Sequence, residues 1–97
     1  MFGQGKLTVE KILCGEPGDC FKYVRHSKGF SFDTMLAAHK FMVPEGCEVL
    51  SAGVFYMRKD CLSVYHMGSI TLKVSPDSED PQRLSEIFRI PCEFEAG

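Results

Sequence analysis

The alternation of apolar and polar residues between positions 62 and 74 is the sequence feature that most constrains the fold. The apolar residues share one parity: Leu62, Val64, Ile70, Leu72 and Val74. The other parity carries Ser63, Tyr65, Ser69, Thr71 and Lys73. A period of two residues is typical of a strand with one buried face. With the apolar stretch 47–57 before it, this alternation predicts one long antiparallel hairpin over residues 47–74.

The length of 97 residues predicts a single domain, 1–97, with one modest core. With 44% hydrophobic and 25% charged residues, the composition is that of a globular protein rather than a disordered chain. Apolar runs fall far short of the ~20 residues that span a bilayer, and the first residues lack a signal-peptide pattern. We therefore expect a cytoplasmic protein without membrane contact. A net charge of -2 with scattered cations also argues against a nucleic-acid partner.

The five cysteines follow one another at intervals of 6, 27, 14 and 31 residues. These intervals match neither a zinc CxxC pair nor the disulfide framework of a small secreted protein. We expect reduced thiols that pack as small hydrophobic side chains, and no metal or cofactor. Cys14 and Cys20 flank the turn 15–19, so a redox pair or half a metal site there is an alternative.

The remaining patterns predict an α+β fold, with two helices on one face of a mostly antiparallel sheet of four to five strands. We expect strands over residues 6–14 and 20–26, with a bulge in the first and Phe21, Tyr23 and Arg25 facing inward in the second. Ser31 is placed to cap a helix over 32–42, and Asp80 to cap a second helix that ends near residue 89. A short edge strand over 92–94 completes the order β-β-α-β-β-α(-β).

Within the hairpin, the pairing of residues predicts a gap on the core face. If the turn is centred on residues 59–60, Met57 opposes Leu62, Gly53 opposes His66, and Ser51 opposes Gly68, and opposed residues share a face. Helix 32–42 would bring a second histidine towards this gap. The candidate ligand-binding residues are therefore His39, His66, Ser51, Gly53 and Gly68.

Two alternatives to this pocket remain open. A register shifted by one residue would place Leu50, Ala52, Val54 and Tyr56 on the core face and fill the gap. Each histidine could instead be a core group bonded to a backbone carbonyl, with the glycines admitting a bulky neighbour such as Phe32.

Strand 47–57 carries apolar side chains on both parities, whereas one helix layer can cover only one face. A partner would cover the second face, and a homodimer is the commonest arrangement. The alternative is that the second face is covered within the chain, by the last helix or by the N-terminal strands. The candidate interface residues are Leu50, Val54, Tyr56, Phe41, Tyr65 and Met67.

A resemblance adds to these patterns. The run 51–53 entering an apolar strand, the segment 64–69, and the Asp-rich lead into the last helix are similar to small uncharacterised bacterial proteins carried on mobile elements. The similarity covers residues 46–88 and implies a compact accessory protein without a defined activity.

These observations favour a self-associating accessory protein that is not an enzyme and that binds another protein or a small ligand. The alternative is a small hydrolase or isomerase-like enzyme in which His39 and His66 exchange protons near neutral pH.

Overall fold

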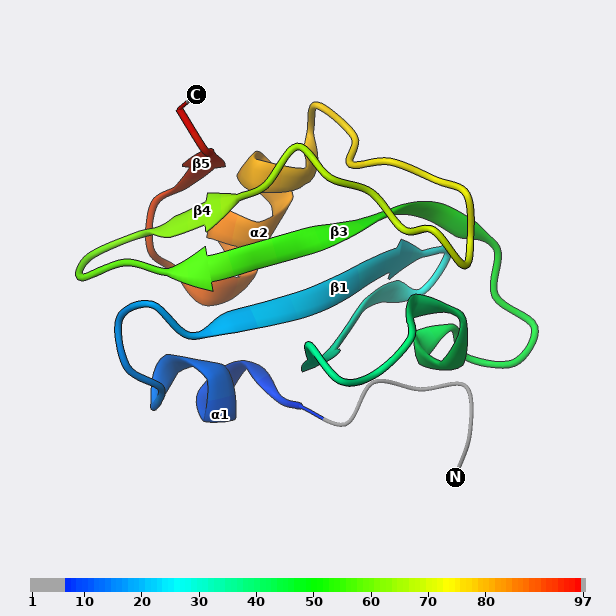
Figure 1. Cartoon of the computed structure of the whole chain (residues 1–97), viewed down its shortest axis with the longest axis horizontal. Helices are drawn as coiled ribbons and strands as arrows, with labels where there is room; N and C mark the ends of the chain where they lie inside the picture. The colour runs from blue at the N-terminus through cyan, green and yellow to red at the C-terminus, as the bar shows by residue number, and fades with distance from the viewer. Residues whose placement is uncertain (1–6, 97) are drawn as a thin grey trace.

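The computed structural model describes residues 7–96 as one sheet with helices packed against it (Figure 1). In chain order the elements are α1 (Val9–Leu13), β1 (Cys20–His26), β2 (Gly29–Thr34), the 3-10 helix η1 (His39–Met42), β3 (Val49–Met57), β4 (Leu62–Val64), α2 (Asp80–Phe88) and β5 (Cys92–Phe94). The strand order is β2-β1-β3-β4-β5, and β5 runs parallel to β4 while the other neighbours are antiparallel. The predicted α+β class with a mostly antiparallel sheet is confirmed.

The predicted helix over 32–42 is wrong, because residues 29–34 form β2. Phe30 and Phe32 alternate with polar residues, and this places both rings on the face where Tyr23 and Phe55 lie. Phe32 pairs directly with Tyr23 across the two strands. Packing of aromatic rings across the sheet therefore outweighs the local helical pattern. Only one 3-10 turn, η1, forms in the second half of the predicted helix.

The predicted strand over 6–14 is also wrong, although Lys6 lies outside the described residues. Thr8 caps the short helix α1 by accepting a hydrogen bond from the amide of Lys11 at 3.2 Å. The change of parity within this segment, which suggested a bulge, is accommodated by the helix, which buries Ile12 completely. The order of elements after α1 is thus β-β-η-β-β-α-β. The first two strands cover residues 20–26 and 29–34 instead of the predicted 6–14 and 20–26.

The predicted hairpin register is confirmed at the two pairs Met57–Leu62 and Phe55–Val64. The predicted strand over 62–74 is wrong beyond Val64, where β4 ends. The chain then folds back on itself, with a single bridge between Ser69 and Val74. Gly68 permits this close approach, since a Cβ there would lie within 2.6 Å of the Ser75 backbone.

Both faces of the sheet are covered within the chain. The face towards α2 carries the larger core, which includes Tyr23, Phe55, Leu62, Leu84 and Phe88. The opposite face, called here the second face, carries a smaller cluster of Val24, Met42 and Ala52 with Leu72 and Val74 packed against it. His26 is also buried, although it lies on the opposite parity to Phe21, Tyr23 and Arg25, which were predicted to face inward.

The C-terminal elements agree with the sequence except at the start of α2, where Asp80 was predicted as the cap. The N-cap is Glu79, which makes no side-chain capping bond, and Asp80 is the first helical residue. α2 has Pro81 in its first turn, Leu84 and Phe88 in the core, and a left-handed residue, Arg89, at its C-cap. β5 is the edge strand predicted over 92–94. No helix within residues 7–96 is long and apolar enough to cross a membrane.

Candidate functional site

His39 is a buried histidine at the start of η1. Its Nε2 lies 2.9 Å from the carbonyl oxygen of Gly53, and since a carbonyl only accepts, Nε2 carries the proton and donates. Burial lowers the pKa of His39 below its ordinary value, the bond to Gly53 opposes this shift in part, and the charge of Lys22 adds to it. His39 is therefore a neutral imidazole near pH 7.

His66 lies in a different place, beyond the end of β4 and next to β5. Its Nε2–H donates to the carbonyl oxygen of Glu95 at 3.1 Å, and its ring stacks on Phe94 with centroids 4.9 Å apart. The side chain is exposed. The structure does not bring His66 together with His39.

Gly53 and Ser51, two residues of the predicted pocket, lie on the α2 side of the sheet. A Cβ at Gly53 would lie 2.9 Å from the Tyr23 ring and 3.1 Å from Pro76, so a bulky neighbour fills the space above this glycine. Ser51 is fully buried, and its hydroxyl donates to Asp80 at 2.9 Å. Of the five predicted pocket residues, only His39 and Gly68 line the same hollow.

That hollow is a groove on the second face, with a volume of about 640 Å³. Its walls are the segments 35–39 and 67–71, and its floor is formed by β1 and β3. The residues that define it include Lys22, Met35, His39, Val54, Met67 and Ile70. The walls expose apolar side chains to solvent, since Met67 is 58% and Ile70 92% exposed. We call this hollow the groove.

Lys22 supplies the charge in the groove. Its ammonium donates a 2.6 Å hydrogen bond to the carbonyl oxygen of Ala37, which ties the first wall to β1. Asp33 lies directly opposite Lys22 in the β1–β2 register, but its Oδ1 accepts from the amide of Thr34. No ion pair within 4.0 Å joins these two side chains in residues 7–96.

The predicted interface residues are spread over several places. Val54 and Met67 line the groove, whereas Leu50 lines a separate hollow near Arg25. Tyr56 and Tyr65 pack against each other with ring centroids 5.1 Å apart and the ring planes tilted by 41°. Phe41 is half exposed beneath the ammonium of Lys40. Val54 is itself buried within the chain, so it is not free to form a contact surface.

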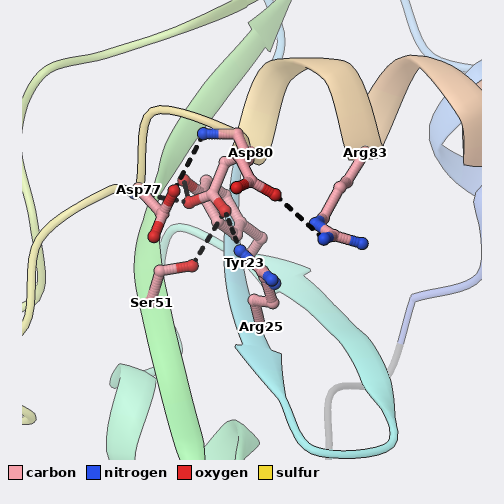
Figure 2. Close-up of polar contacts among 7 residues, drawn as sticks. Tyr23, Arg25, Ser51, Asp77, Asp80 and Arg83 are labelled. Carbon is pink, nitrogen blue, oxygen red and sulfur yellow. Dashed lines mark hydrogen bonds and ion pairs between the residues drawn. The ribbon is translucent and has the colours of Figure 1, made fainter.

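A network around Asp80 was missed by the sequence analysis, which treated this residue as a helix cap (Figure 2). Asp80 is fully buried in the first turn of α2. Its carboxylate accepts from the hydroxyl of Tyr23 at 2.7 Å, the amide of Asp77 at 2.8 Å, the hydroxyl of Ser51 and the guanidinium of Arg25 at 3.3 Å. Burial and the bond to Asp80 raise the pKa of Tyr23, which stays protonated.

The sequence feature that could have predicted this network is Arg25, which lies on the inward parity of β1. An inward guanidinium requires an anionic partner. With four donors the carboxylate of Asp80 is well satisfied, and the network joins α2 to β1 and β3. It is a structural anchor rather than a reactive centre.

A second hollow, of about 390 Å³, lies beside this anchor and is lined by Arg25, Arg83 and Glu86 among others. Both arginines already pair with carboxylates, Arg25 with Asp80 and Arg83 with Glu79. Because each arginine charge is already paired and Glu86 adds a carboxylate to the lining, this hollow does not favour an anion.

The five cysteines are free thiols, of which Cys14 is exposed and the others are half-buried. Burial raises the pKa of Cys92 to about 12, with smaller effects of Cys61 and Glu93, so this thiol is a poor nucleophile. Within residues 7–96, no three His, Cys, Asp or Glu side chains are grouped to hold a metal ion.

Comparisons of the chain with protein-family models, with curated proteins and with solved structures found no match.

Proposed function

We propose that this chain is a non-enzymatic binding protein that holds a small, mostly apolar molecule in the groove. The observation that carries the proposal is the groove itself. Small-molecule sites usually enclose about 300–1,000 Å³, with apolar walls and a few convergent polar groups. The groove, at about 640 Å³, has methionine and isoleucine walls and a lysine and a histidine towards its floor.

The state of the histidines supports binding over catalysis. The hydrolase or isomerase alternative needs two imidazoles that exchange protons with one substrate. The Nε2–H of His39 is held by Gly53, and His66 packs against Phe94 outside the groove. Neither arrangement favours an acid–base pair.

An uncharged fluorescent probe tests the proposal. N-phenyl-1-naphthylamine brightens when it leaves water, so we expect saturable enhancement with the wild-type protein. Ala38 lines the groove, and Ala38→Trp would fill part of its volume. This variant should weaken probe binding by about tenfold or more, equivalent to about 1.4 kcal/mol.

The matched control is Leu13→Trp, which adds an indole on α1, outside the groove. This variant should bind the probe as the wild type does. Absence of saturable enhancement in the wild type, or equal binding by Ala38→Trp, would remove the basis for the proposal.

A second candidate function is self-association through the rim of the groove. Leu36 is 97% and Ile70 is 92% exposed, and both belong to the segments that form or adjoin its walls. Exposed apolar side chains that gather at one site are typical of contact surfaces. Self-association would also suit the compact accessory protein that the sequence resemblance implies.

A further inference from the structure

We propose that the molecule held in the groove is an apolar monocarboxylate, such as a medium-chain fatty acid, and that Lys22 binds its carboxylate. This inference rests on the proposed binding function and names the class of ligand.

The charge of the lining favours an anion. Among the described residues that line the groove, Lys22 alone carries a formal charge, and none is an acid. His39 is neutral and is bonded through Nε2 to Gly53. A carboxylate in the groove would therefore meet one cation and no anion among its lining residues.

Lys22 has donors left for this role. An ammonium group has three N–H donors, and one of them goes to the carbonyl of Ala37. Within residues 7–96 no other hydrogen bond uses this ammonium, which leaves two donors for a ligand. A hydrogen bond between ammonium and carboxylate is about twice as strong as a neutral one. The bond to Ala37 also fixes the position of the ammonium, which lowers the entropy that binding would cost.

Asp33 reduces the positive potential at Lys22 but leaves the ammonium available. The two residues are opposite each other on adjacent strands, and so their side chains share the second face. They are nevertheless not ion-paired, and Asp33 bonds the amide of Thr34. Removing the charge of Asp33 should consequently strengthen the binding of a carboxylate.

The apolar part of the ligand is accounted for by the walls. Met35, Met67 and Ile70 surround the space beyond the ammonium, and each exposes much of its side chain. An alkyl chain would remove this apolar surface from water, which contributes about 25 cal/mol for each Å² buried. Methionine side chains also adapt to ligands of different shape.

The experiment compares decanoate with decanol, which differ in the head group, as competitors of N-phenyl-1-naphthylamine. We expect the wild-type protein to bind decanoate about tenfold more tightly than decanol, as one charge-assisted bond would give. Lys22→Met keeps an apolar stem of similar length and should remove this preference, by weakening decanoate and leaving decanol unchanged. Lys22→Arg should retain the preference.

Asp33→Asn is a gain-of-affinity test, because asparagine keeps an oxygen that can accept from Thr34 and loses the negative charge. It should strengthen decanoate binding by a few-fold and leave decanol unchanged. Added salt should weaken decanoate and not decanol, since screening acts on the charged ligand.

The possible failures are distinguishable. If the probe binds and wild-type protein does not distinguish decanoate from decanol, the carboxylate inference is overturned and the proposed function stands. If Lys22→Met weakens both ligands equally, Lys22 acts only by holding the wall at Ala37, and the inference is again overturned. If the probe itself does not bind, the proposed function fails first.

Discussion

Asp80 is the residue on which the arrangement of the α2 face depends most. Its carboxylate is removed from water, which is unfavourable unless donors replace the lost hydration. Tyr23, Ser51 and Arg25 supply donors from the sheet, and the amide of Asp77 supplies another from the loop before α2. One buried charge thus fixes the position of a helix on two strands.

Replacing Asp80 with alanine should lower the free energy of unfolding by about 3–5 kcal/mol, because the partner charge of Arg25 and two buried hydroxyls lose their acceptor. Urea denaturation followed by circular dichroism measures this loss. Asp80→Asn keeps the shape and one acceptor oxygen, and should lose less.

The control is Asp77→Ala, three residues away, where an exposed carboxylate accepts only from the amide of Glu79 among the described side-chain bonds. Its expected loss is about 1 kcal/mol. Similar losses for Asp77→Ala and Asp80→Ala would contradict the assignment of Asp80 as the anchor.

Sequence patterns could identify individual site residues only in part. His39 and Gly68 were predicted to lie at a pocket, and both line the groove. Lys22 was not singled out, because a lysine on the outward parity of an edge-proximal strand is ordinarily solvated. Its neighbourhood depends on the segments 35–39 and 67–71, for which the sequence patterns predicted part of a helix and part of a strand, whereas both cross the second face largely as loops.

Among the elements, those with strong local patterns were predicted and those decided by distant contacts were not. β1 and β3 follow from apolar stretches bounded by turn residues, α2 from Pro81 and its apolar stripe, and β5 from the short segment after Pro91. β2 was mistaken for a helix because Ser31 and Asp33 resemble a helix start, whereas pairing with β1 determines the outcome. The alternation over 62–74 belongs to a strand only up to Val64, since Leu72 and Val74 pack on the second face from a loop.

The end of α2 offers a test of element geometry. Arg89 adopts a left-handed conformation with φ 61° at the C-cap, where glycine meets no steric penalty. Arg89→Gly should raise the free energy of unfolding by about 0.5–1 kcal/mol. Thermal and urea denaturation both measure this change.

Arg83→Gly is the matched control, because it makes the same substitution inside the same helix. It should lower the free energy of unfolding by about 1 kcal/mol from helix propensity alone, and the ion pair with Glu79 is lost as well. Two changes of the same sign would show that the conformation of Arg89 does not govern the effect.

At the scale of the whole molecule, the sheet is covered on both faces without a second chain. The sequence posed two alternatives for the second face of strand 47–57, and the structure buries Ala52 and Val54 under segments of the same chain. Of β3, Leu50 stays 48% exposed, whereas more strongly exposed apolar side chains, Leu36, Met67 and Ile70, lie in the wall segments of the groove. Self-association is therefore proposed at this rim.

Leu36→Asp and Ile70→Asp test self-association. If two copies meet at the rim, sedimentation should show a dimer for the wild type and a shift to monomer for each variant, by about tenfold or more in dissociation constant. Unfolding should be little changed, since both side chains are more than nine-tenths exposed. Leu13→Asp, on α1, should leave the mass unchanged, and a monomeric wild type would reject the candidate.

The loop between β4 and α2 passes from one face of the sheet to the other around the free side of β3. Leu72 and Val74 pack on the second face, Pro76 lies near Gly53 and the Tyr23 ring, and the amide of Asp77 is bonded to Asp80. Ten residues separate Ile70, at the rim, from Asp80, at the start of α2. If a ligand is bound against Ile70, we expect slower hydrogen exchange in the first turn of α2, because the same loop lines the groove and is bonded to Asp80.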